Sequence, residues 1–137
     1  MTKSNGASRH IETPSGEIAY REAGAGPVAL FVHGALLNSH VWRHQLAELS
    51  DIRHCIVLDL LAHGGTEIAP CQDLSLAANA MMIGEFLDAL KVDQVDLVCN
   101  DTGGAIAQIY AAKNPDRIRS LTLTDSDTQG NIPPEAF

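Results

Sequence analysis

The stretch LVCNDTGGAIAQ, residues 97–108, decides the fold. An apolar run ends at Asn100 and Asp101, two glycines follow, and small residues then continue in a pattern that predicts a helix. A strand that turns directly into a helix needs small residues at the turn, because the two backbones approach each other closely there. The sequence therefore predicts a carboxylate at the apex of a tight strand–helix turn.

Further strands and helices alternate on both sides of this stretch. Alternating strands and crossover helices predict a largely parallel sheet, and so an α/β fold. Residues 10–24 read as a hairpin around Pro14-Ser15-Gly16, which would form an antiparallel edge of that sheet. We expect strands at 28–33, 54–60, 95–99 and 117–125, and helices from Ser39 to about Leu49, at 73–90 and at 103–114.

Composition narrows the function classes. The chain has 137 residues, which suits one domain, and its net charge of −8 disfavours binding to nucleic acid or to an anionic membrane surface. No apolar run reaches the ~18 residues that a membrane span needs, and the polar first ten residues show no secretory signal. Two of the three cysteines, Cys55 and Cys99, lie in apolar runs, so we expect reduced thiols and a cytoplasmic location.

No cofactor or metal is expected. The pair Gly103-Gly104 does not extend to the G-x-G-x-x-G pattern of a dinucleotide loop. His40 and His44 are spaced for one helix face, but no third ligand accompanies them at useful spacing.

The carboxylate of Asp101 can be interpreted in two ways. Aspartate is a favoured helix N-cap, and that is the structural alternative. It can also attack a saturated carbon and form a covalent ester, which water then opens with the help of a general base and of N–H donors for the oxyanion.

Several motifs together resemble the α/β-hydrolase superfamily. The strand–turn–helix around Asp101 resembles its nucleophile elbow, with aspartate where serine is usual. FVHGALLNSHVW (31–42) resembles the oxyanion-loop segment, LDLLAHGGTEIAP (58–70) the D-x-x-G-H-G-x-S segment, and NPDRIRSLTLTD (114–125) the segment after the elbow helix. An elbow aspartate resembles the haloalkane dehalogenase and epoxide hydrolase branch. The likeness runs from about residue 11 onward, so residues 1–10 are expected to be loose and 11–137 to be the N-terminal portion of a hydrolase domain.

The resemblance implies roles for individual residues. Asp101 would be the nucleophile, and the backbone N–H groups of Ala35 and Thr102 would form the oxyanion hole. Dehalogenases usually carry a tryptophan where Thr102 stands, and that tryptophan binds the departing halide. The sequence therefore does not support a halide-binding site. The resemblance also implies structural roles within the motifs for four residues, His33, Gly34, Gly103 and Gly104. Asn38 and Trp42 are expected to contact the substrate.

The general base of the family is a histidine late in the chain, and no histidine follows Asp101 here. The resemblance therefore implies an N-terminal half that stops before the cap domain and the last strands, inactive by itself. An acid partner can follow the strand after the elbow helix, where Asp127 is the preferred candidate over Asp125.

Three functions stay open. The first is a hydrolase that uses Asp101 on a small organic substrate such as an alkyl halide or an epoxide. The second is a non-catalytic or split-enzyme half-domain, which would self-associate or bind a second chain through the exposed edge of the last strand. The third is an ester or lactone hydrolase when complete.

Overall fold

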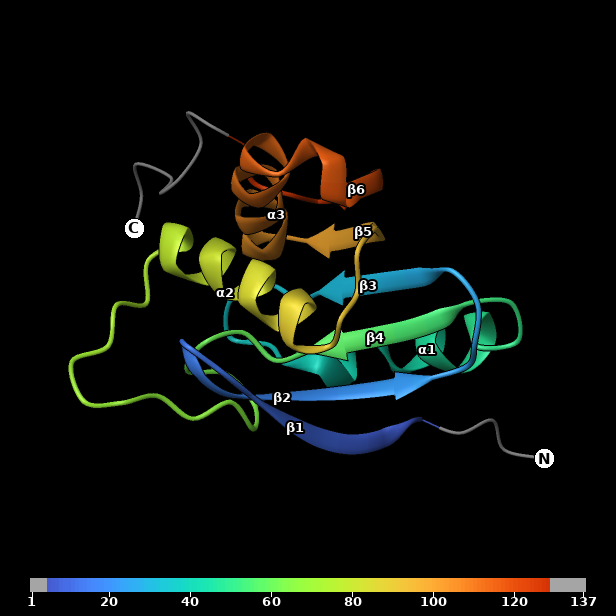
Figure 1. Cartoon of the computed structure of the whole chain (residues 1–137), viewed down its shortest axis with the longest axis horizontal. Helices are drawn as coiled ribbons and strands as arrows, with labels where there is room; N and C mark the ends of the chain where they lie inside the picture. Colours follow the sequence, from blue (N-terminus) through green and yellow to red (C-terminus); the bar gives the residue numbers. More distant parts are fainter. Residues whose placement is uncertain (1–4, 129–137) are drawn as a thin grey trace.

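The computed structural model describes residues 5–128 and contains one mixed sheet with helices on both faces (Figure 1). The strand order is β1-β2-β4-β3-β5-β6. The elements are β1 (Ala7–Thr13), β2 (Gly16–Ala23), β3 (Val28–Val32), the 3₁₀ helix η1 (Ser39–Trp42), α1 (Arg43–Leu49), β4 (His54–Leu58), α2 (Leu76–Ala89), β5 (Val95–Asn100), α3 (Thr102–Lys113), the 3₁₀ helix η2 (Pro115–Arg117) and β6 (Ile118–Thr124).

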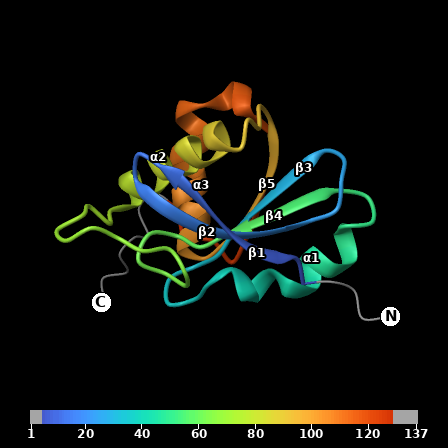
Figure 2. The same cartoon turned by 60° about the horizontal axis from the view of Figure 1, so that its bottom comes forward.

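The predicted α/β architecture is confirmed. Strands β4, β3, β5 and β6 are parallel, and the arrowheads of β3, β4 and β5 point to the same side in Figure 1. The β1–β2 hairpin joins β4 in antiparallel orientation and lies along one edge of the sheet, as expected (Figure 2). Gly16 closes the turn of the hairpin at φ +115°, a backbone conformation that residues with a side chain rarely adopt.

Two expectations about element limits are corrected. The hairpin begins at Ala7 rather than at residue 10, because Ala7 to Thr13 pair continuously with Glu22 to Gly16; residues 7–10 are therefore strand and not a loose terminus. The helix expected from Ser39 to Leu49 is divided into η1 and α1, and Asn38 caps it instead of Ser39, by accepting a hydrogen bond from the N–H of His40.

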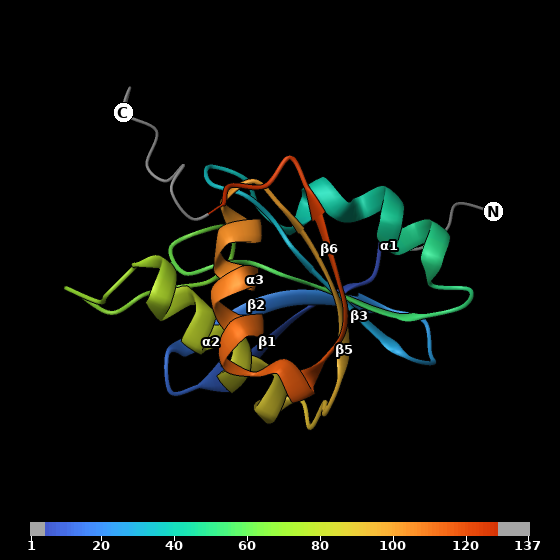
Figure 3. The same ribbon diagram turned by 90° about the horizontal axis from the view of Figure 1, so that it is seen from above.

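Two apolar layers hold the helices against the sheet. Helix α1 covers one face, and α2 and α3 cover the other (Figure 3). Alternate residues of β3 and β4 face opposite sides, so Leu30 and Ile56 pack under α2 and α3 while Phe31 and Val57 pack under α1. This sandwich places the carboxyl ends of β3, β4 and β5 at one edge of the molecule, where parallel sheets bind ligands.

Candidate active site

Asp101 lies at the apex of the turn between β5 and α3, in a strained backbone conformation. Its φ is 53° and its ψ is −130°, a region that residues with a Cβ rarely occupy. The turn is fixed by the backbone, since the N–H of Gly104 donates to the Asp101 carbonyl over 2.9 Å. Asp101 occupies the N-cap position of α3, but its side chain makes no capping hydrogen bond. The capping alternative therefore does not account for the carboxylate.

The Asp101 carboxylate points toward the loop after β3. The N–H of Ala35 donates to its Oδ2 over 3.1 Å, and the hydroxyl of Thr102 lies 3.3 Å from the same oxygen. The structure thus brings together three residues that sequence reasoning assigned to the site. Side-chain oxygen Oδ2 receives both of these hydrogen bonds.

Two glycines allow the close packing at this turn. A Cβ on Gly34 would lie 2.6 Å from the Cβ of Asp101, and one on Gly103 would lie 2.8 Å from the carbonyl oxygen of Val32. Both distances are shorter than real Cβ atoms allow. Gly34 therefore makes room for the carboxylate, and Gly103 lets α3 start against the end of β3.

His33 is a structural residue. Its side chain is fully buried, its Nδ1 lies 2.7 Å from the carbonyl of Gly34, and its Nε2 accepts from the N–H of Leu60 over 3.0 Å. Both ring nitrogens are therefore occupied by backbone groups in the neutral form. Burial lowers the pKa of His33, which opposes a charged state.

The loop after β6 is hydrogen-bonded to the turn at Asp101 and to α3. The N–H of Asp127 donates to the Asp101 carbonyl over 3.3 Å, and the Gln108 side chain donates to the Asp127 carbonyl over 2.8 Å. A Cβ on Gly104 would collide with the side chain of Ser126, so this glycine lets the loop settle on the first turn of α3. Sequence reasoning missed Gln108, whose position four residues after Gly104 was the only available signal.

The two residues expected to contact substrate, Asn38 and Trp42, have other contacts within the described residues. Asn38 caps η1 with its side-chain oxygen and lines a polar cavity of about 310 Å³ beside β1 and β2. The Trp42 ring is buried and packs on Phe31 in the core under α1, with ring centroids 5.3 Å apart.

Other polar groups brace the loops around the site. The buried Asp59 carboxylate accepts from the N–H of Ser39 over 2.6 Å and from that of Gly65 over 2.9 Å, so it braces both loops. Cys99 lies in the core, where burial strongly raises the pKa of its thiol. Within residues 5–128 no three His, Cys, Asp or Glu side chains gather as a metal site would require.

Comparison with known proteins identifies the family of this chain. The family model for the alpha/beta hydrolase fold matches residues 27–137, and this chain belongs to that family. A haloalkane dehalogenase from Mesorhizobium japonicum is 36% identical over 109 residues, which cover 79% of this chain and 35% of that protein. The chain thus spans about a third of the length of that curated relative.

Solved structures agree with this assignment. An epoxide hydrolase from Vigna radiata superposes with a TM-score of 0.83 at 28% identity, covering 87% of this chain and 40% of that one. A bacterial membrane phospholipase A superposes with a TM-score of 0.87, also at 28% identity, covering 90% and 40%. Among the described residues, no helix has both the length and the apolar character to cross a membrane.

Proposed function

We propose that this chain carries the nucleophile of a hydrolase that works through a covalent ester on Asp101. One observation carries the proposal. Asp101 has a strained backbone, its side chain does not cap α3, and its carboxylate accepts a hydrogen bond from the N–H of Ala35 over 3.1 Å. A strained backbone persists only where the surrounding structure enforces it, and such residues are concentrated at active sites. The substrate class is a small organic molecule with a displaceable group on carbon, such as an alkyl halide or an epoxide, in keeping with the relatives named above.

The first chemical step is a displacement by the Asp101 carboxylate. Because the hydrogen bonds of Ala35 and Thr102 go to Oδ2, Oδ1 is the oxygen that attacks the substrate carbon. A carbon–oxygen bond forms and the bond to the leaving group breaks. A halide departs with the electron pair, whereas the oxygen of an opened epoxide keeps the pair, stays attached to the substrate and takes a proton from solvent.

The second step is hydrolysis of the ester. Water adds to Cγ of Asp101, a general base takes the proton of that water, and the negative charge develops on Oδ2. The N–H of Ala35 already points to Oδ2, so it stabilises this charge without rearrangement. Collapse of the intermediate expels the alkoxide, which takes the proton from the base and leaves as the alcohol. The carboxylic acid left on Asp101 then loses its proton to solvent and returns to the carboxylate. Asp127, held beside the elbow, is the candidate to orient the base.

The base comes from polypeptide outside the described residues. His33 uses both ring nitrogens on backbone groups, and His63 does the same with Leu61 and Leu36. His54 pairs with Glu22 at 2.7 Å in β2. The relatives are more than twice as long as this chain, which leaves ample length for a further histidine.

Labelling with ¹⁸O tests the proposal. The full-length protein is incubated with 1-bromobutane or styrene oxide in H₂¹⁸O for several turnovers, and the peptide containing Asp101 is analysed by mass spectrometry. Attack of water on Cγ puts ¹⁸O into the Asp101 carboxylate, whereas direct attack of water on the substrate puts it only into the product. Asp101→Ala is expected to abolish turnover, and Asp116→Ala, at an exposed aspartate of η2, is the matched control. Label confined to the product of the native protein refutes the covalent mechanism.

A second role concerns the edge of the sheet. Six of the seven residues of β6 are exposed, and Leu121 and Leu123 keep 37% and 39% of their surface accessible. These features support pairing of β6 with a further strand, supplied by the rest of a longer protein or by a second chain. Sedimentation of the 137-residue chain tests this: a dimer that Leu123→Lys dissociates supports pairing between chains, and a folded monomer at high concentration contradicts it.

A further inference from the structure

We infer that His63 is a positioning residue, which holds the loop of the Ala35 donor through a neutral imidazole. His63 lies after β4, in the segment that leads to α2, and is half-buried. Its Nδ1 is 2.8 Å from the carbonyl of Leu61, and its Nε2 is 3.3 Å from the backbone nitrogen of Leu36. A carbonyl can only accept and an N–H can only donate, so Nδ1 carries the proton and Nε2 carries the lone pair. Only the neutral ring satisfies both partners.

Leu36 needs this external support. Its φ is 61°, a left-handed conformation that leucine rarely adopts, and 96% of its surface is exposed. Burial of its side chain therefore does not hold the backbone in place. The adjacent residue is Ala35, whose N–H points to Oδ2 of Asp101. The hydrogen bond at Leu36 thus fixes the direction of the neighbouring donor.

Other side chains also hold this loop, besides His63 and the Asp101 carboxylate. His33 contacts the carbonyl of Gly34, and Asp59 accepts from the N–H of Ser39, so the loop is held at its start, middle and end. The His33 ring lies close to His63, with ring centroids 5.2 Å apart, and Asp59 faces His33 in turn. A positive charge on the His63 ring would remove the acceptor for Leu36 and repel a charged His33.

The inference rests on the proposed function in one respect, since the oxyanion that the loop would stabilise belongs to the ester on Asp101. The hold on the loop, however, is measurable without turnover. Two variants separate the two hydrogen bonds of the ring. The amide of His63→Gln can place an oxygen near Nε2 and accept from Leu36, and that of His63→Asn can place a nitrogen near Nδ1 and donate to Leu61.

NMR of the full-length protein decides whether the hydrogen bond exists. A long-range ¹H–¹⁵N spectrum is expected to show the His63 ring protonated at Nδ1, with a scalar coupling across the hydrogen bond between Nε2 and the Leu36 nitrogen. The amide shifts of Ala35 and Leu36 should move in His63→Asn and stay close to native in His63→Gln. His44→Asn, at an exposed histidine of α1, controls for loss of an imidazole. A ring protonated at Nε2, or equal shifts in the two His63 variants, overturns the inference.

Single-turnover kinetics then test the consequence for the reaction. We expect hydrolysis of the Asp101 ester to slow about tenfold in His63→Asn and by less than twofold in His63→Gln, with the rate of ester formation unchanged in both. Equal hydrolysis rates in the two variants overturn the positioning role. Absence of any Asp101 ester in the native protein refutes the proposed function instead, and leaves the NMR result to decide the hold on the loop.

Discussion

The strained backbone at Asp101 predicts that glycine at this position gives a more stable protein than alanine, the reverse of their usual order. Asp101→Ala and Asp101→Gly both remove the carboxylate and its hydrogen bonds to Ala35 and Thr102. They differ only in the Cβ, which is unfavourable at φ 53° and ψ −130°. Relief of such strain is worth about 1–3 kcal/mol, and the greater freedom of glycine in the unfolded chain costs about 0.5–1 kcal/mol. The glycine variant should therefore be more stable by about 1 kcal/mol, and by no more than about 2.5 kcal/mol.

Urea denaturation measures this difference. The midpoint should be higher for Asp101→Gly than for Asp101→Ala at an unchanged slope, which would show that folded-state stability has changed. Ala112→Gly, at an exposed position in α3, provides the matched control and should lose about 0.5–1 kcal/mol as helical glycines do. If Asp101→Gly is equal to or less stable than Asp101→Ala, the strain at the apex is not present.

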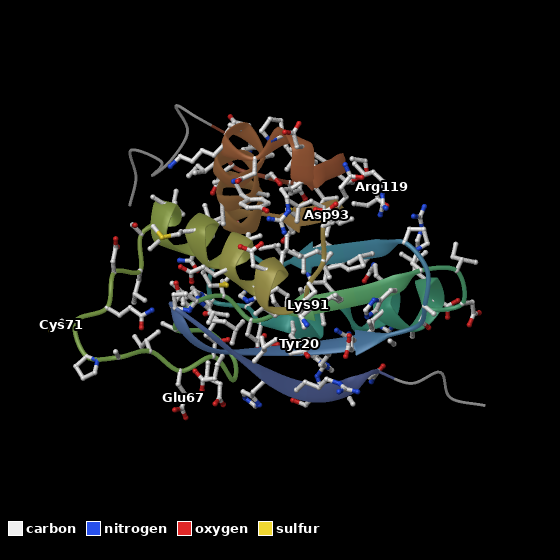
Figure 4. The ribbon with its side chains drawn as sticks, in the orientation of Figure 1. Tyr20, Glu67, Cys71, Lys91, Asp93 and Arg119 are labelled. Carbon is white, nitrogen blue, oxygen red and sulfur yellow. The ribbon has the colours of Figure 1, made fainter. Side chains whose placement is uncertain are left out.

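Three further predictions concern packing, thiols and pH. Gly103→Ala should lower the free energy of unfolding by about 1–3 kcal/mol, because the new Cβ would meet the backbone carbonyls at the end of β3 and backbone cannot move aside easily; a change below 0.5 kcal/mol would contradict this. Iodoacetamide should alkylate Cys71, exposed at the outer bend of the loop before α2 (Figure 4), and should reach Cys99 only in denaturant, as read by peptide mass. Burial lowers the pKa of His33 below its ordinary 6.5, so the unfolded chain binds its proton first, and the stability present above pH 6.5 should decrease as the pH falls toward the folded pKa. His33→Gln should flatten that slope in urea titrations between pH 7 and 5, and an unchanged slope would refute the assignment.

The central strands and the elbow were predictable because their signals are local. Uninterrupted apolar runs define β3 and β4, which are buried on both faces. The elbow required only a strand, a polar apex and two glycines in succession. The parallel order followed from the alternation of strands and helices. In each case the residues that carry the signal are neighbours along the chain.

The edge of the sheet and the supports of the site were not predictable in this way. Residues 7–10 are exposed and three of the four are polar. They form strand because β2 offers hydrogen-bonding partners, which periodicity does not reveal. Trp42 reads as a candidate for substrate contact, but the break between η1 and α1 directs its ring into the core. The contact between His63 and Leu36 joins residues 27 apart and depends on the shapes of two loops.

The two edges of the sheet differ in a way that limits assembly. Strand β1 presents Arg9, His10 and Glu12 along its length, whereas β6 presents Leu121 and Leu123. Charged side chains on an edge strand discourage further pairing, and apolar ones permit it. Growth of a continuous fibre would need two receptive edges on every molecule, and among the described strands β6 alone has such an edge. If β6 pairs with a second copy, as proposed above, association would therefore end at a closed, two-fold pair, with both charged hairpins facing outward.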